Sequence, residues 1–220
     1  MEEKNMQEQT AGKIQIGSYV VGAVQTNFYY LWREGSTDAV AVDPGDYGKE
    51  ICEALREKGL SVCAILVTHA HFDHFLGVKA MKEISGAPVY APLRDKPLFD
   101  HPEMSGSLMG FPVTEMPADY YVREGEEITA GGITFKVLET PGHTEGSCCF
   151  YIEEGHLLLS GDTLFAESVG RTDFPTGSMV KLVRSIKEKL FVLPDDTKVY
   201  PGHMGLTTIG HEKKYNWFVK

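Results

Sequence analysis

The sequence predicts an α/β fold of the α+β kind, in which two mixed sheets are each covered by helices. The order of the elements supports this, because each half of the chain opens with a β-rich stretch and continues with a helix, a strand and a second helix. The 220 residues, 42% of them hydrophobic, are enough for one sizeable domain. We therefore expect residues 1–12 to form a flexible polar terminus and residues 13–220 a single domain.

The first half begins with strand-like residues that turn back at Glu34–Asp38, which predicts an antiparallel meander. A helix follows, since Ile51 and Leu55 recur at helical spacing and Gly59 can end it. An apolar run then predicts a buried strand, and an amphipathic pattern predicts a second helix. The expected elements are strands at 14–24, 27–32, 39–42, 62–67 and 88–91, and helices at 47–58 and 75–84.

The second half follows the same plan without obvious sequence repetition. The expected elements are strands at 126–128, 133–138, 147–152, 156–159 and 198–200, and helices at 179–190 and 208–218. Residues 160–178 are expected to form a loop. Residues 92–118, rich in Pro and Met, are predicted to be the least regular part, either a plain connection or a wall of a binding site.

Three histidines and an aspartate lie within seven residues, between the strand at 62–67 and the following helix. In an extended segment the side chains at i and i+2 point the same way, so His69 and His71 can converge on one metal ion. Asp73 and His74 fall in the following turn and can reach a second ion. Packing alone gives no reason to gather so many titratable groups, and this ligand set suits zinc, iron or manganese.

Three further polar residues each follow an apolar strand and sit in a Gly-bearing turn. They are His143 in Pro-Gly-His, Asp162 in Ser-Gly-Asp and His203 in a second Pro-Gly-His. Glycine allows the sharp bends that would aim these side chains into a common cleft. Together with the first cluster they make a complete set of ligands for two metals.

The His-x-His-x-Asp-His motif and these later turns resemble the metallo-β-lactamase superfamily from about residue 14 onward. The resemblance implies a four-layer αββα sandwich with two divalent metal ions, most often Zn, at one edge. It implies that His69, His71 and His143 hold the first metal. It also implies that Asp73, His74 and His203 hold the second, with Asp162 bridging.

Gly170–Pro175, together with the stretch from Thr207 to Asn216, is similar to the compact, single-domain glyoxalase II-like hydrolases. This resemblance implies cleavage of a thioester, such as a hydroxyacylglutathione, by a hydroxide that bridges the metals, with Asp73 and Asp162 as catalytic residues. Two departures affect substrate choice. The helical glutathione-binding domain of larger members is not expected, and Met204 stands where a small glycine is usual.

A related branch, the persulfide dioxygenases, also carries a Gly-Arg-Thr-Asp-Phe stretch. In that alternative a single iron would be held by His69, His143 and Asp162. The complete second ligand set favours the hydrolase. True β-lactamases are less favoured, because they are usually exported, and a non-catalytic module would normally have lost ligands.

Two residues outside the ligand set have candidate roles. Asp43 ends a strand and can accept a hydrogen bond from a metal-bound imidazole, or it can simply start a turn. Arg171 can bind a substrate carboxylate through its planar fork, or it can tie down its own loop.

The composition of the chain indicates which binding partners and which cellular compartment to expect. The net charge of −10 argues against a nucleic-acid surface, and no apolar run is long enough to span a membrane. The start does not resemble a signal peptide, and the four cysteines lack zinc-knuckle or Cys-x-x-Cys spacing. We expect a cytoplasmic enzyme with free thiols and a small-molecule thioester substrate. The sequence gives no indication of oligomeric state.

Overall fold

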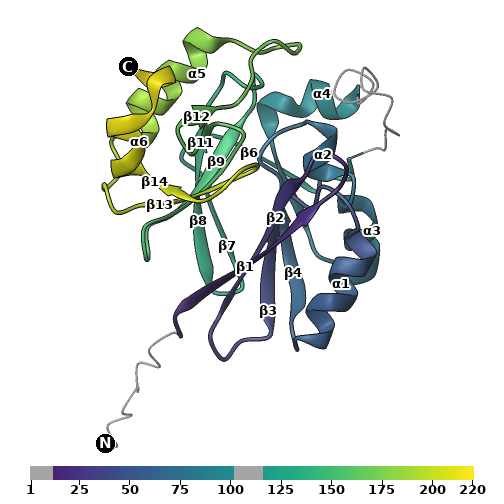
Figure 1. The fold of residues 1–220 in the computed structure, drawn as a ribbon. Coiled ribbons are helices and arrows are strands. Elements are labelled where there is room, and N and C mark those ends of the chain that lie inside the picture. The colour runs from purple at the N-terminus through teal and green to yellow at the C-terminus, as the bar shows by residue number, and fades with distance from the viewer. Residues whose placement is uncertain (1–11, 102–115) are drawn as a thin grey trace, which may run out of the picture.

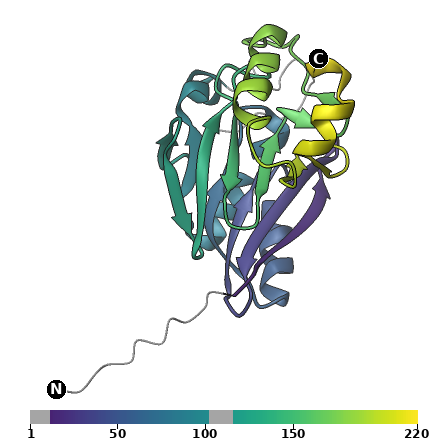
Figure 2. The same cartoon turned by 90° about the vertical axis from the view of Figure 1, so that its left-hand side faces the viewer.

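The computed structural model describes residues 12–101 and 116–220, which build two six-stranded sheets with helices on their outer faces (Figures 1 and 2). The first sheet contains, in spatial order, β1 (Ile14–Val21), β2 (Thr26–Arg33), β3 (Asp38–Val42), β4 (Ser61–Leu66), β5 (Val89–Pro92) and β6 (Tyr120–Val122). The second contains β14 (Thr207–Thr208), β13 (Lys198–Pro201), β10 (Leu157–Gly161), β9 (Cys148–Ile152), β8 (Ile133–Glu139) and β7 (Glu127–Ala130).

Both sheets are mixed, as predicted. Strands β1 to β3 form the expected antiparallel meander, and β3 to β6 then run parallel. In the second sheet β7 to β10 are antiparallel, β13 pairs parallel to β10, and β14 closes the edge antiparallel to β13.

The helices lie outside the sheets. The outer face of the first sheet carries α1 (Gly48–Glu57) and α3 (Val78–Ser85), which lie side by side in Figure 1. The outer face of the second carries α5 (Met179–Ser185), the π-helical η4 (Ile186–Leu190) and α6 (Ile209–Tyr215). The remaining short helices are α2 (Phe72–Phe75), η1 (Leu93–Asp95), α4 (Lys96–Asp100) and η5 (Trp217–Val219).

Alternation along the strands builds the layers. On β3, Val40 and Val42 enter the core between the two sheets, while Ala39 and Ala41 face the helices of the first sheet. Neighbouring Cys148 and Cys149 on β9 divide in the same way, between the central core and the core under α5 and η4. Successive strand residues point to opposite faces, so a sheet that is apolar on both faces needs a partner layer on each. The four-layer αββα prediction is confirmed.

The structure corrects several sequence predictions locally. Asp73 and His74 lie in the short helix α2 rather than in a turn. The loop expected at 160–178 contains a small hairpin of β11 (Leu164–Phe165) and β12 (Ser168–Val169). Residues 93–100 of the expected irregular stretch are helical, and residues 102–115 of it lie outside the described part. The sequence does not predict strand β6, because its three residues carry too little pattern.

The expectation of a flexible terminus falls on residues that, but for Gly12, lie outside the described part. All four cysteines are free thiols, as predicted. Across the two described ranges, no helix has both the length and the apolar character to cross a bilayer.

Candidate metal centre

The predicted ligands lie on four segments, which follow β4, β8, β10 and β13, and the first of these segments includes helix α2. The loop after β4 carries His69 and His71, both buried, and His71 immediately precedes α2 with an extended backbone. The helix then places Asp73 and His74 one and two residues beyond its start. One strand-to-helix connection therefore presents four of the seven predicted ligands.

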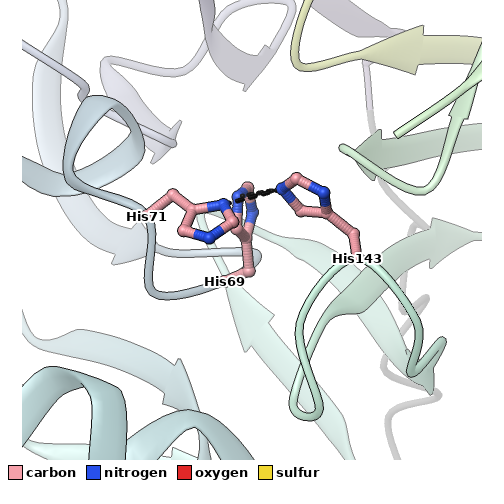
Figure 3. A group of neighbouring side chains, drawn as sticks. All are labelled: His69, His71 and His143. Carbon is pink, nitrogen blue, oxygen red and sulfur yellow. Dashed lines mark hydrogen bonds between the residues drawn. The ribbon is translucent and has the colours of Figure 1, made fainter. Parts of the chain in front are cut away.

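His143 reaches the same place from the loop after β8. Its Nδ1 donates to the carbonyl oxygen of Arg171 over 2.7 Å, which turns Nε2 toward the first loop. Nε2 of His143 lies 2.7 Å from Nδ1 of His71 and 3.1 Å from Nε2 of His69. Figure 3 shows the three rings directed toward one point. The preceding Gly142 has a φ of 148°, and a Cβ there would lie 2.3 Å from the Leu182 nitrogen of α5, so only glycine allows this approach.

A second group forms around Asp73. Its Oδ2 lies 3.2 Å from Nε2 of His203 and 3.4 Å from Nε2 of His74. The hydroxyl of Thr26 also donates to this oxygen over 2.6 Å. The three predicted residues thus converge, although they come from α2 and from the loop after β13.

Asp162 lies between the two groups. Its Oδ2 is 3.4 Å from Nε2 of His143, and its Oδ1 is 3.4 Å from Nε2 of His74. Oδ2 is also 3.6 Å from Nε2 of His203. A Cβ at Gly202 would stand 2.3 Å from Oδ1 of Asp162, which explains the glycine before His203.

The two groups differ in charge. Burial lowers the pKa of His69 well below its ordinary value and that of His71 to about 3, with neighbouring imidazoles adding to both shifts. Burial also lowers the pKa of His143. Burial alone would lower the pKa of His74 too, but three carboxylates around it outweigh burial and raise it. The first group thus offers neutral imidazole lone pairs, and the second is rich in carboxylate.

The residues fit divalent cations. Nε2 of His74 and Oδ1 of Asp162 are buried without a hydrogen-bond partner among the described residues, and they face each other. Three overlapping groups of three residues could each hold a cation, because the donor atoms within each group lie within 4.8 Å of one another. Asp162 belongs to one of these groups. Imidazole nitrogens and carboxylate oxygens at such spacing are the ligands that zinc and iron take. The His/Asp group therefore provides sites for divalent metal ions.

Asp43 lies behind the ligand set and contacts one ligand, His74. Its carboxylate accepts the N–H of Thr68 over 2.8 Å and the Thr68 hydroxyl over 2.7 Å. Its Oδ2 also lies 2.9 Å from Nδ1 of His74, the contact that the sequence suggested. Thr26 and Thr68, which position Asp73 and Asp43, were not foreseen, because lone threonines carry no motif.

A cavity of about 120 Å³ opens beside the two groups. It is lined by Val24, His71, Phe72, Asp73, His143, Asp162, Arg171, Phe174 and His203. The guanidinium of Arg171 stacks 3.9 Å over the Phe174 ring and forms a bidentate pair with Asp173 at 2.7 Å. Arg171 therefore ties down its own loop while also standing at the cavity.

Met204 does not line this cavity. Its side chain is 59% exposed, and its backbone has a φ of 68°, a conformation that glycine adopts more easily. Its carbonyl accepts a hydrogen bond from Asn27 Nδ2 over 2.9 Å. Met204 thus lies at the outer side of the His203 turn.

Comparison with known proteins places this site in a family. The Metallo-beta-lactamase superfamily profile matches residues 21–203. The probable metallo-hydrolase YqgX of Bacillus subtilis is 38% identical over 90% of the chain and 94% of its own length. The hydroxyacylglutathione hydrolase GloC of Haemophilus influenzae is 34% identical over 90% and 95%.

Two solved structures are similar over nearly their whole length. The B3 metallo-β-lactamase BLEG-1 superposes with a TM-score of 0.88 at 38% identity, covering 93% of this chain and 99% of BLEG-1. The di-iron-bound form of TTHA1623 gives 0.83 at 36% identity, covering 92% and 99%. Since the profile spans most of the sequence and the two relatives are 34% and 38% identical over 90% of it, the chain belongs to the metallo-β-lactamase superfamily of metal-dependent hydrolases.

Proposed function

We propose that this protein is a binuclear metal-dependent hydrolase that cleaves a thioester of the hydroxyacylglutathione type. The single observation that carries the two-metal part is the place of Asp162, whose two oxygens lie 3.4 Å from His143 and from His74, one in each group. A carboxylate so placed can bridge two cations. Two such cations, when bound, would lower the pKa of water and polarise a carbonyl oxygen.

The protein's own groups divide the remaining work. His69, His71 and His143 stay neutral because they are buried, so their lone pairs remain available as ligands. Asp73, held by the Thr26 hydroxyl, stands at the cavity and can accept a hydrogen bond from the attacking water and so orient it. A thiolate is a good leaving group, so the reaction needs no strong general acid.

Substrate binding falls to the other cavity walls. The rings of Phe72 and Phe174 offer apolar contact for an acyl group. Arg171 lines the cavity, and its guanidinium can bind a carboxylate of the thiol portion. The similarity to GloC supports a hydroxyacylglutathione as the substrate class. The acidic chain favours a small molecule over a nucleic acid as partner.

Two alternatives have specific support. The likeness to the di-iron-bound form of TTHA1623 supports iron as the metal. Iron is also the metal of the first alternative, a persulfide dioxygenase that uses a single iron. The likeness to BLEG-1 supports β-lactam hydrolysis. The dioxygenase would use one iron on His69, His143 and Asp162, whereas the two hydrolases would use the whole ligand set, so metal count and a substrate panel distinguish the three activities.

The deciding experiment first measures the metal content per chain. It then measures hydrolysis of S-lactoylglutathione, hydrolysis of a chromogenic cephalosporin, and oxygen uptake with glutathione persulfide. Two metals and thioester cleavage that Asp162→Ala abolishes support the proposal. Asp196→Ala is the matched control, because the Asp196 side chain is 76% exposed and its ion-pair partner within the described ranges is His156, away from the ligand set. One iron with oxygen uptake, or β-lactam cleavage without thioester cleavage, would replace the proposed function.

A further inference from the structure

Asp95 is a buried carboxylate outside the predicted ligand set, and it contacts both loops that carry the first three histidines. It ends η1 and directly precedes α4, yet its side chain accepts no hydrogen bond from the backbone of α4. Its oxygens instead accept hydrogen bonds from the two loops that carry these histidines. Fully buried aspartates are uncommon unless their oxygens are satisfied.

One partner lies on the loop after β4. The backbone N–H of Ala70, the residue between His69 and His71, donates to Oδ2 of Asp95 over 2.8 Å. This contact fixes the peptide that joins the two histidines.

The other partners lie on the loop after β8. The hydroxyl of Thr144, which follows His143, donates to Oδ2 over 2.7 Å, and the N–H of Gly146 donates to Oδ1 over 2.7 Å. A Cβ at Gly146 would stand 2.6 Å from Oδ1 and 2.2 Å from the Asp95 nitrogen. Glycine at 146 is therefore what lets the loop approach the carboxylate this closely.

The three hydrogen bonds join a third segment to the two loops that together supply the His69–His71–His143 group. Burial raises the pKa of the Asp95 carboxyl to about 6, while these hydrogen bonds favour its charged form, so it accepts as a carboxylate above pH 7. Charge-assisted hydrogen bonds of this kind are roughly twice as strong as neutral ones.

We infer that Asp95 is a positioning residue, whose carboxylate ties the His69–His71 loop to the His143 loop and so sets the spacing of the three imidazoles. It acts on the first metal site through the backbone, without touching metal or substrate. The second site, built from Asp73, His74 and His203, has no contact with Asp95 among the hydrogen bonds of the described residues. The two sites should therefore respond differently when Asp95 is changed.

The test is a metal titration of the full chain with Zn²⁺ against a chromophoric chelator, and with Co²⁺ followed by its visible spectrum. Asp95→Asn keeps the shape but turns an NH₂ group toward one of the backbone N–H donors. We expect the affinity of the first site for Zn²⁺ to fall at least tenfold, since loss of such supporting contacts costs about 10–100-fold in metal affinity. The affinity of the second site should stay within about threefold of wild type. The Co²⁺ spectrum should lose the component of the three-histidine site.

The matched control is Arg94→Gln. Arg94 is the neighbour of Asp95 and also contacts the loop after β8, through an exposed ion pair with Glu145. Exposed pairs contribute little, so both affinities should stay within about twofold. If Asp95→Asn does not fold, Thr144→Val against Thr144→Ser decides, because only the first removes the hydroxyl donor. Thr144→Val should then weaken the first site.

Equal affinities in wild type and Asp95→Asn, or an equal fall at both sites, would overturn the positioning role. The inference rests on the two-metal proposal, and wild-type stoichiometry tests that separately. A wild type that binds one ion refutes the two-metal part, yet Asp95→Asn must still weaken that ion tenfold for the inference to stand. A wild type that binds none overturns both.

Discussion

Asp43 and His74 share a buried hydrogen bond, with Nδ1 of the imidazole donating to Oδ2 of the carboxylate over 2.9 Å. When His74 is neutral, the proton held on Nδ1 leaves the lone pair on Nε2, the atom that faces Asp73 and Asp162. The carboxylate thus selects the tautomer that can bind a cation. It is itself fixed by two hydrogen bonds from Thr68.

Replacing Asp43 by Asn should therefore weaken the second metal site. An amide accepts the imidazole N–H less strongly and can present an NH₂ group to it instead. We expect a 10–100-fold loss of affinity for the second Zn²⁺, measured by chelator competition. Asp196→Asn, at an exposed position, should bind as wild type does. Unchanged affinity in Asp43→Asn would mean that the carboxylate only shapes its turn.

Thr26→Val tests the orientation of Asp73. The change removes the hydroxyl that donates to Oδ2 over 2.6 Å and keeps the side-chain volume. We expect kcat for the thioester to fall roughly tenfold, about 1.4 kcal/mol, with KM within about twofold, because the contact orients an attacking water and not the substrate. Thr129→Val, on an exposed strand position, serves as the control. A rise in KM at constant kcat would contradict this role.

Arg171→Gln tests carboxylate recognition. If the guanidinium binds the thiol portion, KM for S-lactoylglutathione should rise roughly tenfold, the size of one charge-assisted contact, while a lactoyl thioester of a neutral thiol should not respond. Asp173→Asn removes the bidentate partner and leaves the guanidinium free, so its KM should not rise. An equal effect of Arg171→Gln on both substrates would show that Arg171 serves its loop alone.

The metal-free protein should lose stability in acid through His71. Its pKa is about 3 when folded and about 6.5 when unfolded, because burial disfavours the charged form. Between these values the unfolded chain binds more protons, so stability is present above about pH 6.5 and falls as the pH is lowered.

The measurement is urea unfolding of chelator-treated protein at about pH 7 and about pH 5. Wild type should lose about 2 kcal/mol more than His71→Gln between these values, since one pKa unit is worth about 1.4 kcal/mol. The comparison with the variant cancels the contributions of titrating groups that do not interact with His71. Identical losses in the two proteins would show that His71 is not buried as a neutral ring without metal.

The sequence reveals those parts of the site in which one short segment carries several ligands. His69, His71, Asp73 and His74 are visible as a cluster, and a strand before and a helix after them place the cluster at a sheet edge. Periodicity also gives the two sheets and their covering helices. What it does not give is contact between distant segments, such as Asp95 with Gly146. An aspartate before a short helix looks like an ordinary cap, and only the tertiary structure shows where it points.

The ligands come from loops after β4 in the first sheet and after β8, β10 and β13 in the second. Each of the two cation sites combines ligands from both sheets, so a bound cation is a removable cross-link between the two halves of the sandwich. At a free metal concentration a hundred times the dissociation constant, such binding would add about 2.7 kcal/mol to the free energy of unfolding. Because neither sheet alone carries the full ligand set, tight metal binding requires that both sheets have formed and packed together. Metal uptake can therefore be used to measure the completion of folding.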